Sequence, residues 1–224
     1  MMSTTRGRKE NRGANNRATV EAYDRYALDY ARSTAEGGAR QGHRALAQLL
    51  EVIEPDGNIL EIGSGAGWDA DWRLEKAGFR VRRTDAAMAF VRFQESRGVH
   101  AERLDVVQDD LTGPYDAVVA LHVLQHIDRS ALPAVLRKVS RALREGGAFL
   151  FSISEGRGDV VEQGASGQYY VAMWQQAELS EVLVPLGFRL QWSISDQDNE
   201  GSWLTMLVVK KGHDRKETVR PLAI

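Results

Sequence analysis

Residues 59–67 read ILEIGSGAG, an apolar run that passes directly into a glycine-rich segment. The apolar residues predict a buried strand, and the residues after the glycines predict a helix at about 68–77. Glycine lets the backbone turn sharply where a side chain would clash, and the first turn of a helix presents free N–H groups that suit an anion. The strand–loop–helix order therefore predicts a ligand site around Gly63, Gly65 and Gly67.

Strand and helix patterns alternate along the chain on both sides of this loop. Fully apolar runs such as 117–121 are typical of strands buried on both faces of a parallel sheet. The alternation predicts an α/β, Rossmann-like, doubly wound sheet with helices on both faces. Two last strands, at 188–194 and 203–209, are joined too closely for a parallel crossover, so one of them should be antiparallel. The other expected strands are 79–85, 101–107 and 148–153, and the expected helices are 20–31, 42–53, 87–97, 131–144 and 175–186.

The composition is that of an ordinary globular protein with one domain. The 224 residues are 43% hydrophobic and 27% charged, and the formal net charge of -2 gives no signal for nucleic acid or a membrane. We expect a domain at 19–211 between a mobile basic tail at 1–18 and a polar C-terminal tail at 212–224. Five basic residues leave a contact of the first tail with RNA open: Arg6, Arg8, Lys9, Arg12 and Arg17.

The absence of cysteine excludes disulfides, thiolate metal sites and cysteine nucleophiles. No apolar run reaches the length that spans a bilayer, and the first residues lack the apolar core of a signal peptide. We therefore expect a cytoplasmic protein with no membrane partner.

A second signal lies at the expected end of the second strand. Asp85 follows Gly63 by about 20 residues, the spacing at which an acidic side chain accepts hydrogen bonds from ribose hydroxyls. The alternative role for Asp85 is the N-cap of the helix that begins near residue 87, and the two roles are compatible.

Together these segments resemble the class I methyltransferases, which use S-adenosylmethionine (SAM). ILEIGSGAG is similar to the glycine motif of that family, and the likeness extends through Asp85 to three further segments, GPYDAVVALHVLQHI, ALREGGAFLFSI and LSEVLVPLGFRL. It covers about residues 20–210. The resemblance implies a seven-stranded sheet with an antiparallel last strand, SAM as cofactor and S-adenosylhomocysteine (SAH) as product.

The resemblance also implies a role for each matching residue. Asp85 would hold the ribose, with Ala86 beside the adenine. Asp105, flanked by Val106, would reach the adenine amino group, with Asp109 and Asp110 as competitors for that role. Leu121 or His122 would bound the sulfonium end. The residues expected around the methionine part of SAM are Glu61, Gly63, Ser64, Gly65 and Gly67.

The segment AYDRYALDYA, residues 22–31, is similar to one that covers SAM in many small-molecule methyltransferases. Tyr23 and Tyr30 would then close over the cofactor. The alternative is a docking helix whose tyrosines serve only in packing.

Methyl transfer needs a base only when the acceptor atom arrives protonated, and histidine suits that task near neutral pH. His122 and His126 follow the fourth strand, at the edge where open α/β sheets bind ligands. Gln125 between them could orient a substrate. The alternative for His126 is a structural bond to a nearby backbone group. No third ligand accompanies the two histidines, so no metal is expected.

Aromatic residues follow a long loop expected at 154–168. Tyr169, Tyr170 and Trp174 are the predicted acceptor-binding residues, and their alternative role is packing that loop against the sheet. Trp203 is expected in the core.

The sequence thus predicts a SAM-dependent methyltransferase that acts on an oxygen or nitrogen atom of a small molecule. One alternative is an RNA or protein acceptor, which only the basic tail supports. A second is a nicotinamide-dependent oxidoreductase, which would require glycine where Trp68 stands. A third is a SAM-binding protein without catalytic activity.

Overall fold

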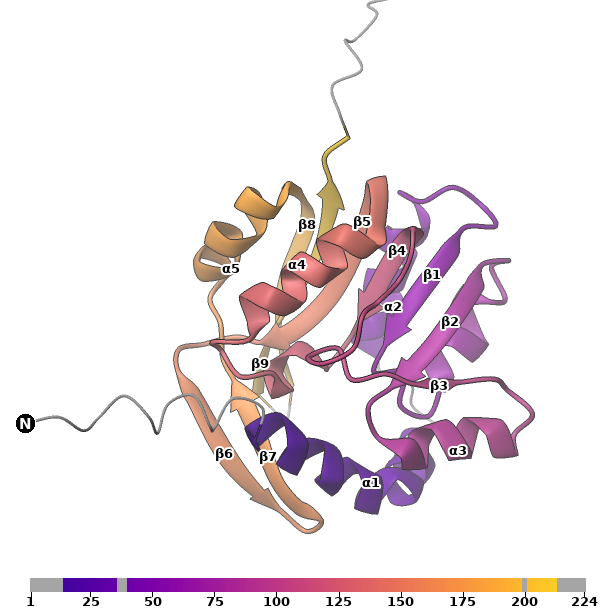
Figure 1. Ribbon diagram of the computed structural model, residues 1–224, viewed down its shortest axis with the longest axis vertical. Coiled ribbons are helices and arrows are strands. Elements are labelled where there is room, and N and C mark those ends of the chain that lie inside the picture. The colour runs from indigo at the N-terminus through magenta and orange to yellow at the C-terminus, as the bar shows by residue number, and fades with distance from the viewer. Residues whose placement is uncertain (1–13, 36–39, 199–200, 213–224) are drawn as a thin grey trace, which may run out of the picture.

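The computed structural model describes residues 14–35, 40–198 and 201–212, and its centre is a seven-stranded sheet covered by helices (Figure 1). None of the described helices has the length and apolarity that crossing a bilayer needs. The strands are β1 (Asn58–Ile62), β2 (Arg80–Asp85), β3 (Glu102–Arg103), β4 (Tyr115–Ala120), β5 (Leu143–Ser154), β6 (Asp159–Gly164), β7 (Gly167–Ala172), β8 (Phe188–Asp198) and β9 (Gly201–Lys210). The helices are α1 (Ala14–Thr34), α2 (Arg40–Leu50), α3 (Met88–Ser96), α4 (Leu132–Ala142) and α5 (Gln176–Leu183), with short turns η1 (Ala70–Leu74), η2 (Leu124–His126) and η3 (Val184–Leu186).

The order of the strands in the main sheet is β3-β2-β1-β4-β5-β9-β8. β1 pairs in parallel with β2 and β4, and β4 pairs in parallel with β5. β9 runs antiparallel to both of its neighbours, β5 and β8. The predicted seven-stranded Rossmann-like sheet with an antiparallel last strand is therefore confirmed.

Alternate residues of the central strands pack into two separate core layers. Ile59 and Ala117 lie with α2 on one face, whereas Leu60 and Val118 lie with α4 and α5 on the other. All four side chains are fully buried. Burial on both faces fixes the strands, so the positions of their carboxyl ends are fixed as well.

Several predicted elements differ in extent from the observed ones. The helix expected at 68–77 is reduced mainly to η1, which Arg83 of β2 holds through ion pairs to Asp71 and Glu75. The third strand has two residues, because the backbone turns at Asp105, where the N–H groups of the residues three and four positions later bond to its carbonyl. Helix α1 includes part of the predicted tail, residues 14–18, while residues 1–13 and 213–224 lie outside the described residues.

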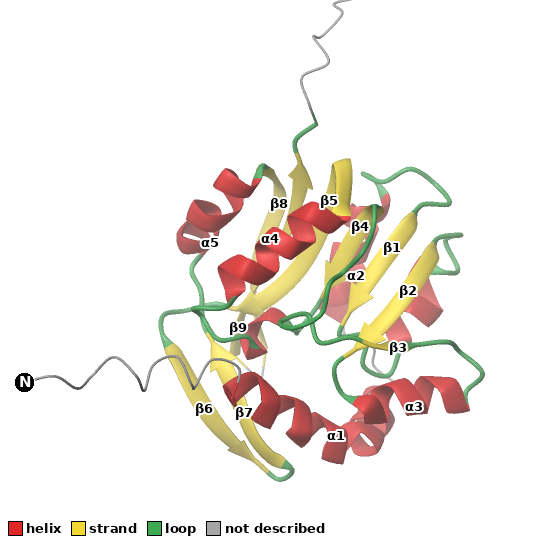
Figure 2. Ribbon diagram, viewed as in Figure 1, coloured by secondary structure: helices red, strands yellow, loops and turns green. Residues whose placement is uncertain are grey.

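The predicted loop at 154–168 is wrong, because β6 and β7 form a hairpin there. Figure 2 shows this hairpin as a two-stranded sheet apart from the main one. Nearly all of β6 is exposed. Since β6 buries no face, its sequence carries no apolar alternation by which a strand could be predicted.

Helix α1 lies across the end of the sheet at which β1, β2 and β4 point their carboxyl ends (Figure 1). Its Asp24 side chain accepts the backbone N–H of Ala89 near the start of α3, at 2.7 Å. On the other side, Thr19 accepts the N–H of Tyr170 in β7 at 2.9 Å, and Arg25 donates to the carbonyl of Ser166 at 2.6 Å. Helix α1 and the hairpin thus cover the edge where ligands bind in open α/β sheets.

Candidate functional site

The glycine loop is a backbone cradle that larger residues could not form. Gly63, Gly65 and Gly67 have φ angles of +68°, +54° and +83°. A Cβ on Gly63 would lie 2.3 Å from the Val123 side chain, and one on Gly67 would lie 2.6 Å from Gln94. The Gln94 amide also donates to the Ser64 hydroxyl and the Gly65 carbonyl, at 2.8 and 2.9 Å. The predicted loop is therefore held in shape by its neighbours.

Asp85 joins this loop to the start of α3. Its two carboxylate oxygens accept the N–H groups of Gly65, at 2.9 Å, and Ala87, at 2.8 Å. Burial raises the pKa of Asp85 to about 6. The N-cap residue of α3 is Ala87, so the helix-capping alternative for Asp85 is wrong: its bond to Ala87 holds the turn before the helix. The remaining lone pairs of the carboxylate leave room for further donors. Ala86, beside it, is half-buried.

Glu61 is a buried acid with an unused oxygen. It is 4% exposed, and its Oε2 atom has no hydrogen-bond partner in the part of the chain that the structure describes. Burial, with the nearby charge of Asp69, raises the pKa of Glu61 well above its usual range. A buried carboxyl oxygen of this kind needs a donor or a cation to satisfy it. The cradle and this oxygen together fit the ammonium-bearing end of SAM.

Asp105 lies beside the end of β2, because the N–H of Leu104 bonds to the Asp85 carbonyl at 2.9 Å. The Asp105 carboxylate accepts the N–H of Val107 at 2.9 Å and faces Asn16 of α1 at 3.5 Å. Asp109 instead holds the backbone N–H of Asp105, at 2.8 Å. Of the predicted competitors, Asp110 is exposed. Asp105 and Val106 are both buried, at the position expected for an adenine contact.

His126 lies in a chain of hydrogen bonds between α1 and the hairpin. Its Nδ1 atom lies 2.8 Å from the Tyr170 carbonyl, and its Nε2 atom lies 3.0 Å from the Tyr23 hydroxyl. Burial lowers the pKa of His126 to about 4. The neutral ring must then donate from Nδ1 to the carbonyl and accept at Nε2. The structural alternative for His126, a bond to nearby backbone, is thus observed.

Gln125 lies next to this chain. Its amide nitrogen lies 3.3 Å from the His126 Nε2 atom, and its Oε1 atom is buried with no partner among the described residues. Gln125 therefore offers a free acceptor near the Tyr23 hydroxyl.

His122 leaves β4 with a strained backbone, at φ +57°. Its N–H donates to the Ser152 hydroxyl at 2.7 Å, and its ring forms a T-shaped pair with Trp203, with centroids 4.5 Å apart. Burial lowers the pKa of His122, while the charge of Asp198 opposes that shift. Within the described chain, neither ring nitrogen of His122 makes a hydrogen bond. Leu121, just before it, is partly buried against the α2 layer.

Aromatic rings gather between α1, α3 and the hairpin. The ring of Tyr23 lies 6.2 Å from Tyr30, 6.2 Å from Phe90 and 5.2 Å from Tyr169, measured between centroids. Tyr30 also lies over the glycine loop, since a Cβ on Gly65 would be 3.8 Å from its ring. Tyr23 and Tyr30 thus face the region where they are expected to cover a cofactor.

The other predicted aromatic residues are buried. Tyr170 is 3% exposed, and its hydroxyl donates to Asp159 at 2.7 Å. Trp174 is 6% exposed and stacks under Arg129 at 3.9 Å. Both side chains belong to the main core cluster. Only Tyr169 of the three lies against Tyr23, so the packing alternative describes the other two.

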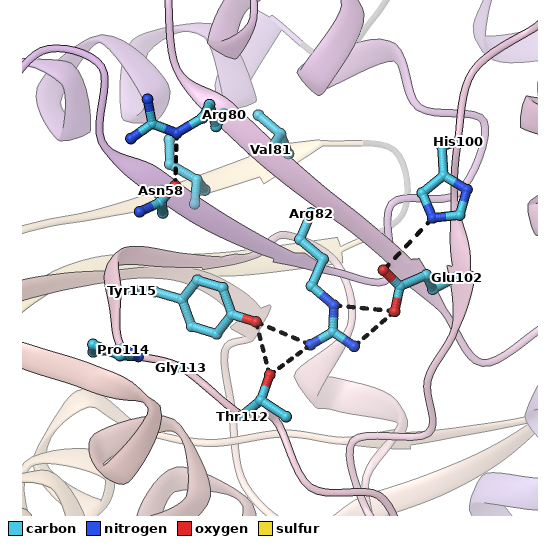
Figure 3. Close-up of a pocket in the computed structure, with 11 residues that line it drawn as sticks. Asn58, Arg80, Val81, Arg82, His100, Glu102, Thr112, Gly113, Pro114 and Tyr115 are labelled. Atoms are coloured by element: carbon cyan, nitrogen blue, oxygen red, sulfur yellow. Dashed lines mark hydrogen bonds and ion pairs between the residues drawn. The ribbon is translucent and has the colours of Figure 1, made fainter.

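A cavity of about 410 Å³ lies at the opposite edge, beside the amino ends of β1, β2 and β4 (Figure 3). Arg82 occupies its centre and donates to Glu102 at 2.8 Å, to Tyr115 at 2.9 Å and to Thr112 at 3.1 Å. These bonds pair the guanidinium within the protein. None of the lining residues belongs to the glycine loop, so this cavity is separate from the ligand site expected at the carboxyl ends of the strands.

Three residues at the carboxyl ends of the strands were missed as site residues by sequence reasoning. The sequence places Asn16 in a tail, Phe90 in a helix and Trp203 in the core, without a role in the site. Trp203 is indeed buried, yet it lies against His122. Trp203 lies near His122 because β9 runs antiparallel to β5. The close spacing of the last two strands already indicates that one of them is antiparallel.

Comparisons with known proteins agree with this geometry. A family model described as a methyltransferase domain matches residues 31–197. No curated protein matches the sequence at a significant level.

Several solved structures share the fold. The 1,6-didemethyltoxoflavin N1-methyltransferase of Burkholderia thailandensis, solved with 1,6-didemethyltoxoflavin and SAH, has a TM-score of 0.62 and 21% identity over 87% of this chain and 91% of its own. The DhpI–SAH complex has a TM-score of 0.67 and 21% identity over 88% and 98%. A SAM-dependent methyltransferase of Clostridium acetobutylicum has a TM-score of 0.65 and 14% identity over 85% and 99%.

At these identities the solved structures establish the fold, and the family match over most of the chain establishes the enzyme class. The expected cofactor, SAM, is thereby confirmed, and the nicotinamide alternative is not supported. This chain belongs to the class I methyltransferases that depend on SAM.

Proposed function

We propose that this enzyme methylates an oxygen or nitrogen atom of a small molecule. The observation that carries the proposal is the cover that α1 and the β6–β7 hairpin form over the carboxyl ends of the strands. Bonds from Thr19 and Arg25 to the hairpin close that edge with the chain's own contacts. A small acceptor can be enclosed by such a cover, whereas a folded RNA or protein would have to displace it. The Burkholderia neighbour, whose structure contains 1,6-didemethyltoxoflavin, supports the same class of acceptor.

The cofactor side of the site is formed by the loop and the ends of β1, β2 and β3. SAM supplies an electrophilic methyl group on a sulfonium and leaves as SAH. Glu61 accepts from the ammonium of its methionine part, because its Oε2 atom is otherwise unsatisfied. Asp85 accepts from the ribose hydroxyls in addition to its two backbone donors. The remaining cofactor contacts proposed are Gly63, Ser64, Gly65, Gly67, Ala86, Asp105, Val106, Leu121, Tyr23 and Tyr30.

The acceptor side is formed by residues that follow β4 and by the hairpin. Gln125 offers its free Oε1 atom to an O–H or N–H of the acceptor. Tyr169 provides an apolar ring next to Tyr23. Tyr170 and Trp174 shape this side from behind, through the core and the His126 bond.

The two histidines have different environments, which suggests different roles. Both nitrogens of His126 are engaged, so it orients Tyr23 and contacts the acceptor region as a neutral ring. His122 has no ring hydrogen bond within the described chain, so its nitrogens are available to take a proton from the acceptor.

The class of acceptor can be tested with SAM that carries a radioactive methyl group. A cell extract is divided by ultrafiltration, and each fraction is incubated with the wild-type enzyme and with Asp85→Asn as a control. We expect label only in small molecules of the filtrate, and only with the wild type. Label that stays in the retained fraction and is released by ribonuclease or protease would overturn the proposal and favour an RNA or protein acceptor.

A further inference from the structure

The antiparallel direction of β9 brings Trp203 to the ligand-binding edge. Trp203 pairs with Ser154, the last residue of β5, so it stands where the parallel strands end. Its side chain is 7% exposed. A tryptophan near the start of an antiparallel strand therefore lies beside the same edge as the glycine loop, although it belongs to the last strand of the chain.

His122 meets Trp203 from the end of β4. Its left-handed backbone turns the ring out of the strand, a conformation that histidine adopts more often than most residues but that still stores strain. The Ser152 hydroxyl holds this turn through the His122 N–H. The two rings lie at 74° to each other, with centroids 4.5 Å apart. The neighbouring residue, Val123, contacts Gly63 of the loop, so the pair lies close to the methionine end of the cofactor site.

Asp198 at the end of β8 fixes the indole of Trp203. Its Oδ1 atom accepts the Trp203 Nε1–H at 3.1 Å and the Gly201 N–H at 3.1 Å. The titratable groups that act on His122 are Asp198, from this side, and His126, from η2. His126 is neutral, and Ser152 and Trp203 are uncharged. Asp198 is thus the charge that can stabilise a proton on His122.

We propose that Trp203 and Asp198 are positioning residues for His122, the residue that takes the proton of the methyl acceptor. The O–H or N–H bond of the acceptor breaks, its proton moves to a ring nitrogen of His122, and the bonding pair stays on the acceptor atom. The imidazolium that forms is stabilised by the π-face of Trp203 and the carboxylate of Asp198. This inference rests on the proposed function, because it assumes an acceptor that arrives protonated.

Direct titration of His122 by NMR tests this without a known acceptor. The full chain is labelled at histidine, saturated with SAH, and titrated as wild type, Trp203→Leu, Trp203→Phe and Asp198→Asn. His122→Asn, which suits the left-handed backbone, assigns the signal. Asp198→Asn keeps an acceptor oxygen for the Trp203 indole and removes the charge.

We expect Trp203→Leu to lower the pKa of His122 by about 0.4–0.7 units, the shift that a cation–π contact produces. Trp203→Phe should keep the pKa of His122 close to its wild-type value, because an aromatic ring remains. Asp198→Asn should lower the pKa of His122 by roughly a few tenths of a unit. The affinity for SAH should stay within about threefold, since neither residue is a proposed cofactor contact.

An unchanged His122 titration in Asp198→Asn, and in Trp203→Leu where that variant folds, would overturn the inference. A large loss of SAH affinity in these variants would also overturn it, because Trp203 would then act through the cofactor site. Failure of the wild type to bind SAH would instead refute the proposed function itself.

Discussion

Asp85 should make SAH binding depend on pH, because the carboxyl must be ionised to accept from both the backbone and the ribose. Burial raises its pKa to about 6 in the ligand-free protein. Added ribose donors favour the ionised form, so SAH should return the pKa towards its ordinary value of 3.8. Binding below pH 6 should then release a proton, and the affinity should rise with pH up to about 7.

The size of the effect follows from these two values. At about pH 5, a carboxyl with a pKa of about 6 is ionised in roughly one molecule in eleven, and one with a pKa of 3.8 is almost fully ionised. SAH should therefore bind about tenfold more weakly at pH 5 than at about pH 7.5. Asp85 should contribute about 0.85 of a proton released for each SAH bound at pH 5, and nearly none at pH 7.5.

Isothermal calorimetry in buffers of different ionisation enthalpy measures both quantities at once. Asp85→Asn should bind SAH weakly at both pH values and release no proton through this group. An asparagine amide cannot accept from both Gly65 and Ala87, so melting curves must show that the variant is folded. Glu61→Gln is the matched control, because it removes a second buried carboxyl with a raised pKa and should leave the contribution of Asp85.

Two results would refute this reasoning. SAH affinity that is the same at both pH values, with no proton released, would show that the ribose does not bond to Asp85. Wild-type affinity in a folded Asp85→Asn variant would show that Asp85 only joins the loop to α3.

Three further substitutions follow from the same site. Because the pKa of Glu61 is raised in the folded state, ionisation of Glu61 destabilises the fold as pH rises. Glu61→Gln should therefore melt roughly 2–6 °C higher than the wild type at pH 8, and calorimetry should show that it binds SAH more weakly. His126→Ala removes the ring that bonds to the Tyr23 hydroxyl and leaves the buried Tyr170 carbonyl without this donor, at a cost of about 1–3 kcal/mol. Hydrogen exchange should therefore speed up in α1 before the main sheet, and unchanged exchange would contradict the assigned bonds. Gly63→Ala should abolish SAH binding or folding, whereas Gly98→Ala, also at positive φ but with open space around it, should cost only about 1 kcal/mol in a denaturation curve.

The sequence was sufficient for the middle of the sheet because β1, β4 and the second half of β5 bury both faces. Ile59 and Leu60 pack into opposite layers, so the strand reads as a continuous apolar run bounded by glycine and turn residues. The carboxyl edge of the sheet, and with it Glu61, Asp85 and His122, could be located from the same pattern. The close spacing of the last two strands added that one of them runs antiparallel, whereas the order of the strands in the sheet was not predicted.

The cover over the site was less predictable, because polar contacts hold it. β6 exposes nearly all of its residues, and its partner β7 is held to α1 by Thr19 and Arg25. The start of α1 is tied to the rest of the site by Asn16 and Asp105, which lie far apart in the sequence. Periodicity records which face of an element is buried in apolar surroundings, and it carries no trace of long-range hydrogen bonds.

Trp203 shows how a correct assignment to strand and core can still hide a role in the site. An apolar residue in the middle of a strand is buried by the layers above and below it, and nothing else is required of it. In β9 the first residues pair with the end of β5, so burial of Trp203 occurs at the edge where His122 turns out of β4. The distance of a residue from the carboxyl end of the neighbouring parallel strand therefore carries functional information that burial alone does not. Measured in that way, Trp203 and Asp198 belong with the residues that follow β4, although the chain reaches them last.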